Sequence, residues 1–203
     1  MKIGGGEHCY EWIENWARIP KNGSGRANGR THGVVVNRAG EVIVFNQADP
    51  AVLFFGRGGS LLRSWGDRFP GAHGLTLVEE DGEEFFWLTD HDSGEVVKTT
   101  PDGRTLLNLE QPEHPVYDSA NYAPTWVAVN ETRFGGNGDI WVTDGYGSSC
   151  IHRYDSAGDY LDSINGGEGA AGAFDCPHAV WTDTRNGEAE LYIADRGNHR
   201  IQV

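Results

Sequence analysis

The chain has 203 residues, with 30 aspartate and glutamate side chains against 16 lysine and arginine side chains, so its formal net charge is −14. This acidity, without any basic run, argues against a nucleic acid or an anionic membrane as a partner and suits a soluble protein or a small ligand. Glycine is frequent, at 29 residues, and 7 tryptophans are present, which is typical of an all-β chain with many turns.

Residues 1–30 are expected to form an irregular N-terminal segment. The first six residues contain no apolar run, so we expect no signal peptide, and no stretch reaches the ~18 apolar residues of a membrane-spanning helix. The segment Tyr10–Trp16 fits either a short strand or one helical turn, and its aromatic side chains are expected to pack under the first sheet. Lys21–Arg30 is rich in glycine and asparagine and should be a loop.

The cysteines give an expectation about the compartment. Cys9, Cys150 and Cys176 are an odd number and lack the spacing of a metal site. We therefore expect reduced thiols in a cytoplasmic protein.

From Thr31 onward, a unit of short strands separated by turns repeats. A landmark at the start of each unit falls at His32, His73, Thr125 and His178, at spacings of 41, 52 and 53 residues. Four short antiparallel strands in a period of this size are typical of a propeller blade. The fold class predicted is therefore all-β, a β-propeller with about four blades.

The predicted blades span residues 31–66, 72–108, 124–164 and 177–203. Strands are expected at 34–37, 41–45, 51–55, 60–65, 75–78, 84–89, 95–99, 104–108, 127–130, 139–143, 150–154, 159–164, 179–182, 191–194 and from 200. The last blade is incomplete at Val203, and closed propellers avoid open sheet edges. We expect the natural protein to continue for roughly two more blades, so that this chain forms an open arc.

Two sets of positions should converge near the propeller axis. One set is the landmark that opens each first strand. The other follows the end of each second strand: Asn46-Gln47, Asp90-His91, Asp144-Gly145-Tyr146 and Asp195-Arg196. We interpret the three aspartates as turn-forming or capping residues.

Several motifs, in one order along the chain, resemble a known family. Asp195–Val203 is similar to the NHL repeat signature. The fuller series consists of Ala72-His73-Gly74-Leu75, Trp87-Leu88-Thr89-Asp90, Pro124-Thr125, Trp141-Val142-Thr143-Asp144-Gly145-Tyr146, Pro177-His178 and Ala194-Asp195-Arg196. This series, which covers about Val34 to Val203, resembles the peptidyl-α-hydroxyglycine α-amidating lyases, a family of six-bladed NHL-type propellers with a central zinc.

The resemblance implies roles for five residues. His73 and His178 match two of the three zinc-binding histidines of the family, and the third ligand is expected beyond Val203, in a later blade. Tyr146 matches the tyrosine assigned as catalytic base, and Arg196 matches an active-site arginine. The carbonyl of Leu75 matches a contact to a structural calcium.

The sequence departs from the family at two kinds of position. Gln47 stands where the family has its other active-site arginine. Since that charge would help to hold an anionic substrate, its loss puts the substrate in doubt. The two disulfides of the animal enzymes are also missing, and this suits a reducing compartment; the positions concerned are Tyr122 with Gly147 and Tyr192 with Val203.

The function predicted is a zinc-dependent lyase. Three neutral imidazoles and one open position make a catalytic zinc site, which can acidify a bound hydroxyl. The reaction implied by the resemblance cleaves the C–N bond of an α-hydroxyglycine-type carbinolamide to an amide and glyoxylate, with a small-molecule or peptide-like substrate. Two alternatives stay open. One is a non-catalytic NHL propeller that binds a protein partner at its rim, and the other is a metal-dependent hydrolase or lactonase-like propeller with another substrate.

Each candidate residue also has a purely structural interpretation. His73 and His178 could be strand-start imidazoles bonded to a neighbouring blade, Tyr146 could fill the channel, and Arg196 belongs to a signature that other NHL repeats use structurally. His32 shares the landmark but matches no ligand of the family. The remaining histidines of the repeats are expected at the surface: His91, His114, His152 and His199.

Overall fold

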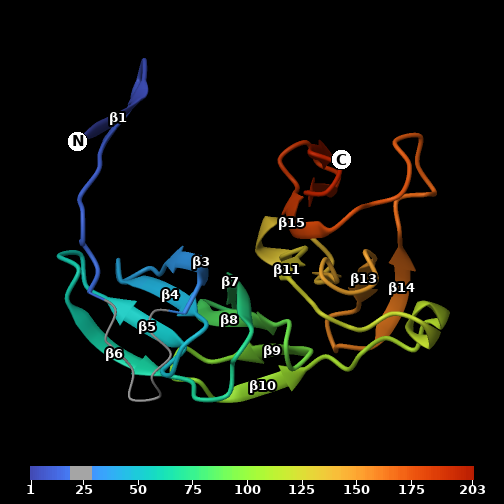
Figure 1. Ribbon diagram of the computed structural model, residues 1–203, viewed down its shortest axis with the longest axis horizontal. Coiled ribbons are helices and arrows are strands. Elements are labelled where there is room, and N and C mark those ends of the chain that lie inside the picture. Colours follow the sequence, from blue (N-terminus) through green and yellow to red (C-terminus); the bar gives the residue numbers. More distant parts are fainter. Residues whose placement is uncertain (19–28) are drawn as a thin grey trace.

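The computed structural model describes residues 1–18 and 29–203. In this part of the chain, four antiparallel sheets follow one another around an arc, and the only helical elements are two short 3₁₀ turns (Figure 1). The predicted all-β propeller with four blades is therefore confirmed. Most of the predicted loop at 21–30 lies outside the described residues. No helix of the described residues is long and apolar enough to cross a bilayer.

The first two blades have four strands each, and neighbouring strands in the sheet are neighbours in the sequence. The first blade contains β3 (Thr31–Val36), β4 (Val42–Asn46), β5 (Val52–Phe55) and β6 (Leu61–Trp65). The second contains β7 (Ala72–Glu80), β8 (Glu83–Asp90), β9 (Glu95–Thr99) and β10 (Thr105–Asn108).

The third blade is again four-stranded, and the fourth has three strands. The third contains β11 (Trp126–Val129), β12 (Ile140–Thr143), β13 (Ile151–Tyr154) and β14 (Tyr160–Ile164), and the fourth contains β15 (Pro177–Asp183), β16 (Glu190–Asp195) and β17 (Arg200–Gln202). The 3₁₀ turns η1 (Pro115–Asp118) and η2 (Thr132–Phe134) lie in the connections before β11 and before β12. Every strand predicted from Thr31 onward overlaps an observed one.

The first strands of successive blades, β3, β7, β11 and β15, lie side by side on the inner side of the arc. Side-chain hydrogen bonds tie them together between blades. The Thr76 hydroxyl on β7 donates to the Val127 carbonyl at 2.6 Å, and the Thr182 hydroxyl on β15 donates to the Val129 carbonyl at 2.7 Å. Residues at the starts of these strands are therefore brought close together.

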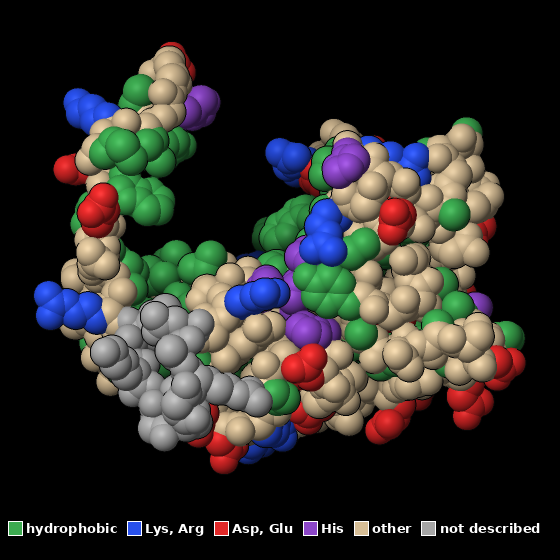
Figure 2. Space-filling view, viewed as in Figure 1, with side chains coloured by type: hydrophobic (Ala, Val, Ile, Leu, Met, Phe, Trp, Pro, Cys, Tyr) green, Lys and Arg blue, Asp and Glu red, His purple; other side chains and the backbone are tan. Residues whose placement is uncertain are grey.

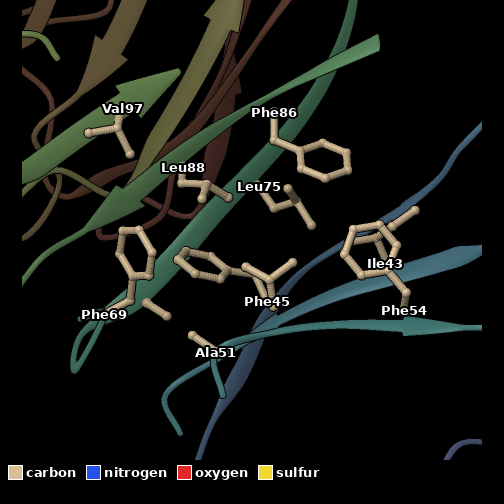
Figure 3. Packing of buried hydrophobic residues seen from close by; sticks show 11 residues of the cluster. Ile43, Phe45, Ala51, Phe54, Phe69, Leu75, Phe86, Leu88 and Val97 are labelled. Carbon is tan, nitrogen blue, oxygen red and sulfur yellow. The ribbon is translucent and has the colours of Figure 1, made fainter. Parts of the chain in front are cut away.

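Apolar side chains from facing sheets fill the space between blades. Figure 3 shows the cluster between the first two blades, where Phe45 and Phe54 of the first sheet meet Leu75 and Phe86 of the second. The Phe45 ring packs edge-on against Phe69, with centroids 5.2 Å apart. Burial of these rings stabilises the contact of one blade with the next, because the area removed from water is largely apolar.

The N-terminal segment differs from the expectation of irregular structure. Strands β1 (Lys2–Gly5) and β2 (His8–Glu11) form an antiparallel hairpin on an arm that projects from the first blade (Figure 1). Only part of the predicted aromatic packing occurs. The ring centroids of Trp16 and Phe55 are 6.3 Å apart, whereas Trp12 is exposed.

Buried aspartates at the ends of the second strands hold the loops around the channel. Asp90 accepts hydrogen bonds from the backbone N–H groups of Gly71, before β7, and of Ser93, in the following turn, at 2.9 and 2.8 Å. Asp144 likewise accepts hydrogen bonds from the backbone N–H groups of Ala123, before β11, and of Ser148, in the turn after β12, at 2.7 and 2.8 Å.

Asp195 completes the pattern in the fourth blade. It accepts from the N–H of Asp175 and from the side chain of Asn198, both at 2.8 Å, and from Arg200 at 2.7 Å. Each carboxylate thus joins the entry to the first strand with the turn after the second strand. The interpretation of these aspartates as turn-forming residues is confirmed by these hydrogen bonds.

Around Asp144 the network extends into the interior of the blade. The Tyr117 hydroxyl lies 2.8 Å from the Asp144 carboxylate and 2.7 Å from Nε2 of His152, which is fully buried. The expectation that His152 lies at the surface is therefore wrong. Burial would raise the pKa of Asp144, but the nearby His152 imidazole and the hydrogen bonds that the carboxylate accepts from Ser148 and Ala123 hold the pKa below its usual value.

We predict that Phe45→Ala lowers the free energy of unfolding by about 3–5 kcal/mol, because it opens a cavity between the first two blades. The matched control is Leu62→Ala on β6, where the side chain is 52% exposed and the change should stay within about 1 kcal/mol. Denaturant unfolding of both variants checks this. Equal losses in both would contradict the assignment of the inter-blade core.

We also predict that Asp144→Ala lowers the free energy of unfolding by more than about 2 kcal/mol, because it removes a buried carboxylate and leaves the partly buried backbone N–H groups of Ala123 and Ser148 without an acceptor. Asp162→Ala on β14 removes an exposed carboxylate, and its effect should lie within about 0.5 kcal/mol. Thermal and urea unfolding measure both values. A loss below about 1 kcal/mol for Asp144→Ala would show that the network does not hold the loop.

Candidate functional site

His73 is buried at the start of β7, and its ring is held by the next blade. Nδ1 lies 2.7 Å from the Thr125 carbonyl oxygen, which also accepts from the Thr89 hydroxyl at 3.0 Å. Since a carbonyl only accepts, Nδ1 carries the proton, and the lone pair of the neutral ring lies on Nε2. Gly74 permits this approach, because a Cβ there would lie 2.7 Å from the same carbonyl oxygen.

Tyr146 and His178 converge on His73 from the third and fourth blades. The Tyr146 hydroxyl lies 3.3 Å from Nε2 of His73 and 2.9 Å from Nε2 of His178. The two imidazole centroids are 4.6 Å apart. Gly145 allows the Tyr146 loop to pass the neighbouring blade, because a Cβ there would lie 2.6 Å from the Pro177 carbonyl oxygen.

Arg196, directly after β16, completes the group. Its Nη1 lies 3.3 Å from the Tyr146 hydroxyl, and its guanidinium lies 5.2 Å from the centroid of the Tyr146 ring. The structure thus brings together the four side chains that the sequence singled out around the channel, His73, His178, Tyr146 and Arg196. We call this group the His73–His178 site.

The two histidines are strongly biased towards the neutral form. Burial lowers the pKa of His73 to about 3, and repulsion from His32 and His178 adds to the effect. Burial also lowers the pKa of His178 to about 4, with a further contribution from the charge of Arg196. Neutral imidazoles are the form that ligates metals.

His32 also lies at the site, as its landmark position predicted. Its ring stacks on His73 with centroids 4.2 Å apart and an interplanar angle of 18°. Burial, together with repulsion from His91 and Arg30, lowers the pKa of His32. The stacked ring supports the orientation of His73.

Gln47 and His91, which belong to the second set of positions expected near the propeller axis, lie at the edge of the site. His91 was expected at the surface, but its ring centroid lies 5.2 Å from that of Tyr146 and 5.8 Å from that of His73. Nε2 of His91 lies 3.1 Å from the amide nitrogen of Gln47. Their position in the sequence was the signal that pointed to the site, because both residues follow the end of a second strand, as Arg196 does.

Leu75 lies two residues after His73 on β7, and its side chain is buried between the first two blades. Only its backbone carbonyl could contribute to a channel, and the calcium contact assigned to it stays a prediction. Thr125, the landmark residue of the third blade, is buried and serves the site through the carbonyl that fixes His73.

The described side chains fit part of a metal site. Two neutral imidazoles present Nε2 to one point, now taken by the Tyr146 hydroxyl, and a carbonyl orients one of them from behind, as is typical of ligating histidines. No group of three His, Cys, Asp or Glu side chains in the described residues is arranged to hold a metal. The chain thus offers two imidazole ligands, and a catalytic zinc usually has three protein ligands.

Histidine side chains gather on the viewed face of the molecule, close to lysine and arginine side chains (Figure 2). His32 lies on β3, His73 on β7 and His178 on β15, so the rings that meet at the site come from three different blades.

Comparison with known proteins agrees with the motifs. A probable peptidyl-alpha-hydroxyglycine alpha-amidating lyase of Caenorhabditis elegans is 34% identical over 137 residues, covering 64% of this chain and 35% of that protein. Peptidyl-alpha-hydroxyglycine alpha-amidating lyase 1 of Drosophila melanogaster is 33% identical over 159 residues, covering 71% and 27%. The human NHL repeat-containing protein 3 is 26% identical over 215 residues, covering 96% and 56%.

This chain spans between about a quarter and just over half of the length of these relatives. No protein-family model matches the sequence. Among solved structures, a streptogramin B lyase superposes with a TM-score of 0.58 over 92% of this chain and 56% of that one, at 14% identity, which is a likeness of fold alone. The chain is a β-propeller that resembles, in sequence, the peptidyl-α-hydroxyglycine α-amidating lyases and the NHL repeat proteins.

Proposed function

We propose that the His73–His178 site belongs to a zinc-dependent lyase. Its reaction would cleave the C–N bond of an α-hydroxyglycine-type carbinolamide and release an amide and glyoxylate. The observation that carries this proposal is the position of the Tyr146 hydroxyl, between Nε2 of His73 and Nε2 of His178 and within 3.3 Å of Arg196. The names of the relatives from the worm and the fly support the same reaction.

His73 and His178 would hold the metal through Nε2, and a third ligand is expected from a later blade. Bound there, zinc would supply a Lewis acid that polarises and acidifies a hydroxyl of the substrate. The low pKa values of both histidines favour this role, because protons compete little for the ligand nitrogens near neutral pH.

Tyr146 would move the proton of the reaction. Its oxygen takes the proton from the α-hydroxyl of the substrate, the C=O bond of glyoxylate forms, and the electron pair of the C–N bond leaves with the amide nitrogen. That nitrogen takes up a proton, so the two products together contain all the atoms of the carbinolamide. The side chain is 39% exposed, which leaves it open to a substrate from solvent.

Arg196 would stabilise the deprotonated Tyr146 oxygen and bind an oxygen of the substrate. A guanidinium has several N–H donors in a fixed plane, so it can contact the phenol oxygen and a second acceptor together. Its exposed position beside the Tyr146 ring leaves donors for that second contact.

We predict that the full-length protein binds about one zinc per chain and that His73→Ala and His178→Ala each remove most of it. His8→Ala, which changes an exposed histidine of the N-terminal hairpin, is the matched control and should keep the metal. Elemental analysis after dialysis measures the content. Wild-type protein that is folded and free of metal after zinc loading would instead support the non-catalytic binding module.

We further predict that Tyr146→Phe lowers kcat by about 10²–10⁴-fold and keeps the zinc, because only the proton-transferring oxygen is removed. Tyr10→Phe, at an exposed position of the hairpin, should have no effect. Glyoxylate release from an N-acyl-α-hydroxyglycine gives the rate. Undiminished turnover by Tyr146→Phe would eliminate the tyrosine base.

A further inference from the structure

Three polar side chains beside the His73–His178 site have no part in the proposed chemistry. Gln47 follows β4 of the first blade, and His91 and Asp92 follow β8 of the second. The Gln47 amide nitrogen lies 3.1 Å from Nε2 of His91, and Nδ1 of His91 lies 3.1 Å from a carboxylate oxygen of Asp92. They form a chain that joins two blades at the edge of the site.

The chemistry of the partners fixes the direction of these contacts. An amide nitrogen donates, so Nε2 of His91 must supply the lone pair, and the proton of the neutral ring then lies on Nδ1, beside the Asp92 carboxylate. This uses one of the two N–H bonds of Gln47. In the described part of the chain, no other hydrogen bond involves the Gln47 side chain, so its carbonyl oxygen and its second N–H are available to a ligand.

The backbone around these residues is held in place. The N–H of Gln47 donates to the Arg30 carbonyl at 2.9 Å, and the N–H of His91 donates to the Gly71 carbonyl at 3.1 Å. The side chain of His91 is only 21% exposed and lies edge-on to the Tyr146 ring. Gln47 is therefore held by His91, whose ring borders Tyr146, at the edge of the His73–His178 site.

We propose that Gln47, oriented by His91 and Asp92, is a specificity-determining residue that selects substrates with an uncharged amide at the group next to the carbinol carbon. This inference rests on the proposed lyase function and names the substrate class of the same site. An amide presents one acceptor and one donor, which match the free N–H and the carbonyl oxygen of Gln47.

A carboxylate fits this arrangement less well. It has only acceptors, so it would face the Gln47 carbonyl oxygen without a hydrogen bond, and the Asp92 carboxylate on the far side of His91 adds repulsion. The net charge of −14 acts in the same direction at long range. An N-acyl-α-hydroxyglycinamide would then be cleaved between its acyl-amide nitrogen and its carbinol carbon, which gives the carboxamide of the acyl group and glyoxylamide. The hydroxyl proton is transferred as in the proposed reaction, and no further reactant is needed.

The test compares kcat/KM for an N-acyl-α-hydroxyglycinamide and for the N-acyl-α-hydroxyglycine with the same acyl group, using zinc-loaded full-length protein. Wild type should favour the amide by about 10-fold or more, chiefly through KM. Gln47→Arg should reverse the preference, because a guanidinium binds a carboxylate bidentately. His91→Ala should bring the ratio close to one, and Gln111→Arg, which adds the same charge at an exposed position away from the site, should leave it unchanged.

Two outcomes would overturn the proposal. One is a ratio that does not change in Gln47→Arg. The other is a wild-type preference for the carboxylate that Arg30→Ala abolishes, since Arg30 would then hold the anion in place of Gln47.

If neither substrate is cleaved, the lyase function fails, and selectivity is measured separately by calorimetry with the unreactive N-acylglycinamide and N-acylglycine. Tighter binding of the amide, reversed in Gln47→Arg, would still support the specificity. Equal binding in both proteins would overturn it.

Discussion

A buried carboxylate at the end of the second strand of a blade is the constraint on which the channel face depends. Asp90, Asp144 and Asp195 are each fully buried, and each binds backbone N–H groups of the segment that enters the same blade. A buried charge is tolerable only when it is fully hydrogen-bonded, so the loop geometry has few alternatives. The residues that follow these aspartates are therefore placed by the fold. They include Tyr146 and Arg196, whose side chains meet although they are 50 residues apart in sequence.

In the first blade, Asn46 takes the equivalent place. Its amide donates to the Ala51 carbonyl at 2.9 Å, whereas its side-chain oxygen has no hydrogen-bond partner among the described residues. The Asn46 side chain thus makes fewer hydrogen bonds to its loop than the three aspartates make to theirs, and the residue that follows it is Gln47.

Contacts of the candidate site residues also join neighbouring blades. The carbonyl of Thr125 in the third blade sets the tautomer of His73 in the second, and Tyr146 of the third blade contacts His178 of the fourth. Displacement of one blade against another would therefore change the orientation of the candidate ligands. This coupling explains why the apolar packing between the sheets matters for the site as well as for stability.

Much of the fold could be predicted from sequence because each blade repeats the same strands and turns, and the recurring landmark gave the period. The convergence of His73 and His178 followed from that period. The orientation of His91 was misjudged although its position after β8 was expected near the axis, because a histidine after a strand has the same sequence pattern whether its side chain faces solvent or the channel. His152 was misjudged for a related reason. Its burial depends on Tyr117 in a long connection whose path no local pattern reveals. The N-terminal hairpin has only short strands, and its Gly-rich sequence resembles a loop.

The most direct test of the central idea is the position of zinc in the full-length protein, located by anomalous diffraction at the zinc edge from zinc-loaded crystals. We predict one peak at about 2.0–2.1 Å from Nε2 of both His73 and His178, with the Tyr146 oxygen beside it. The absence of a peak between the two imidazoles, or imidazoles that face away from each other, would contradict it.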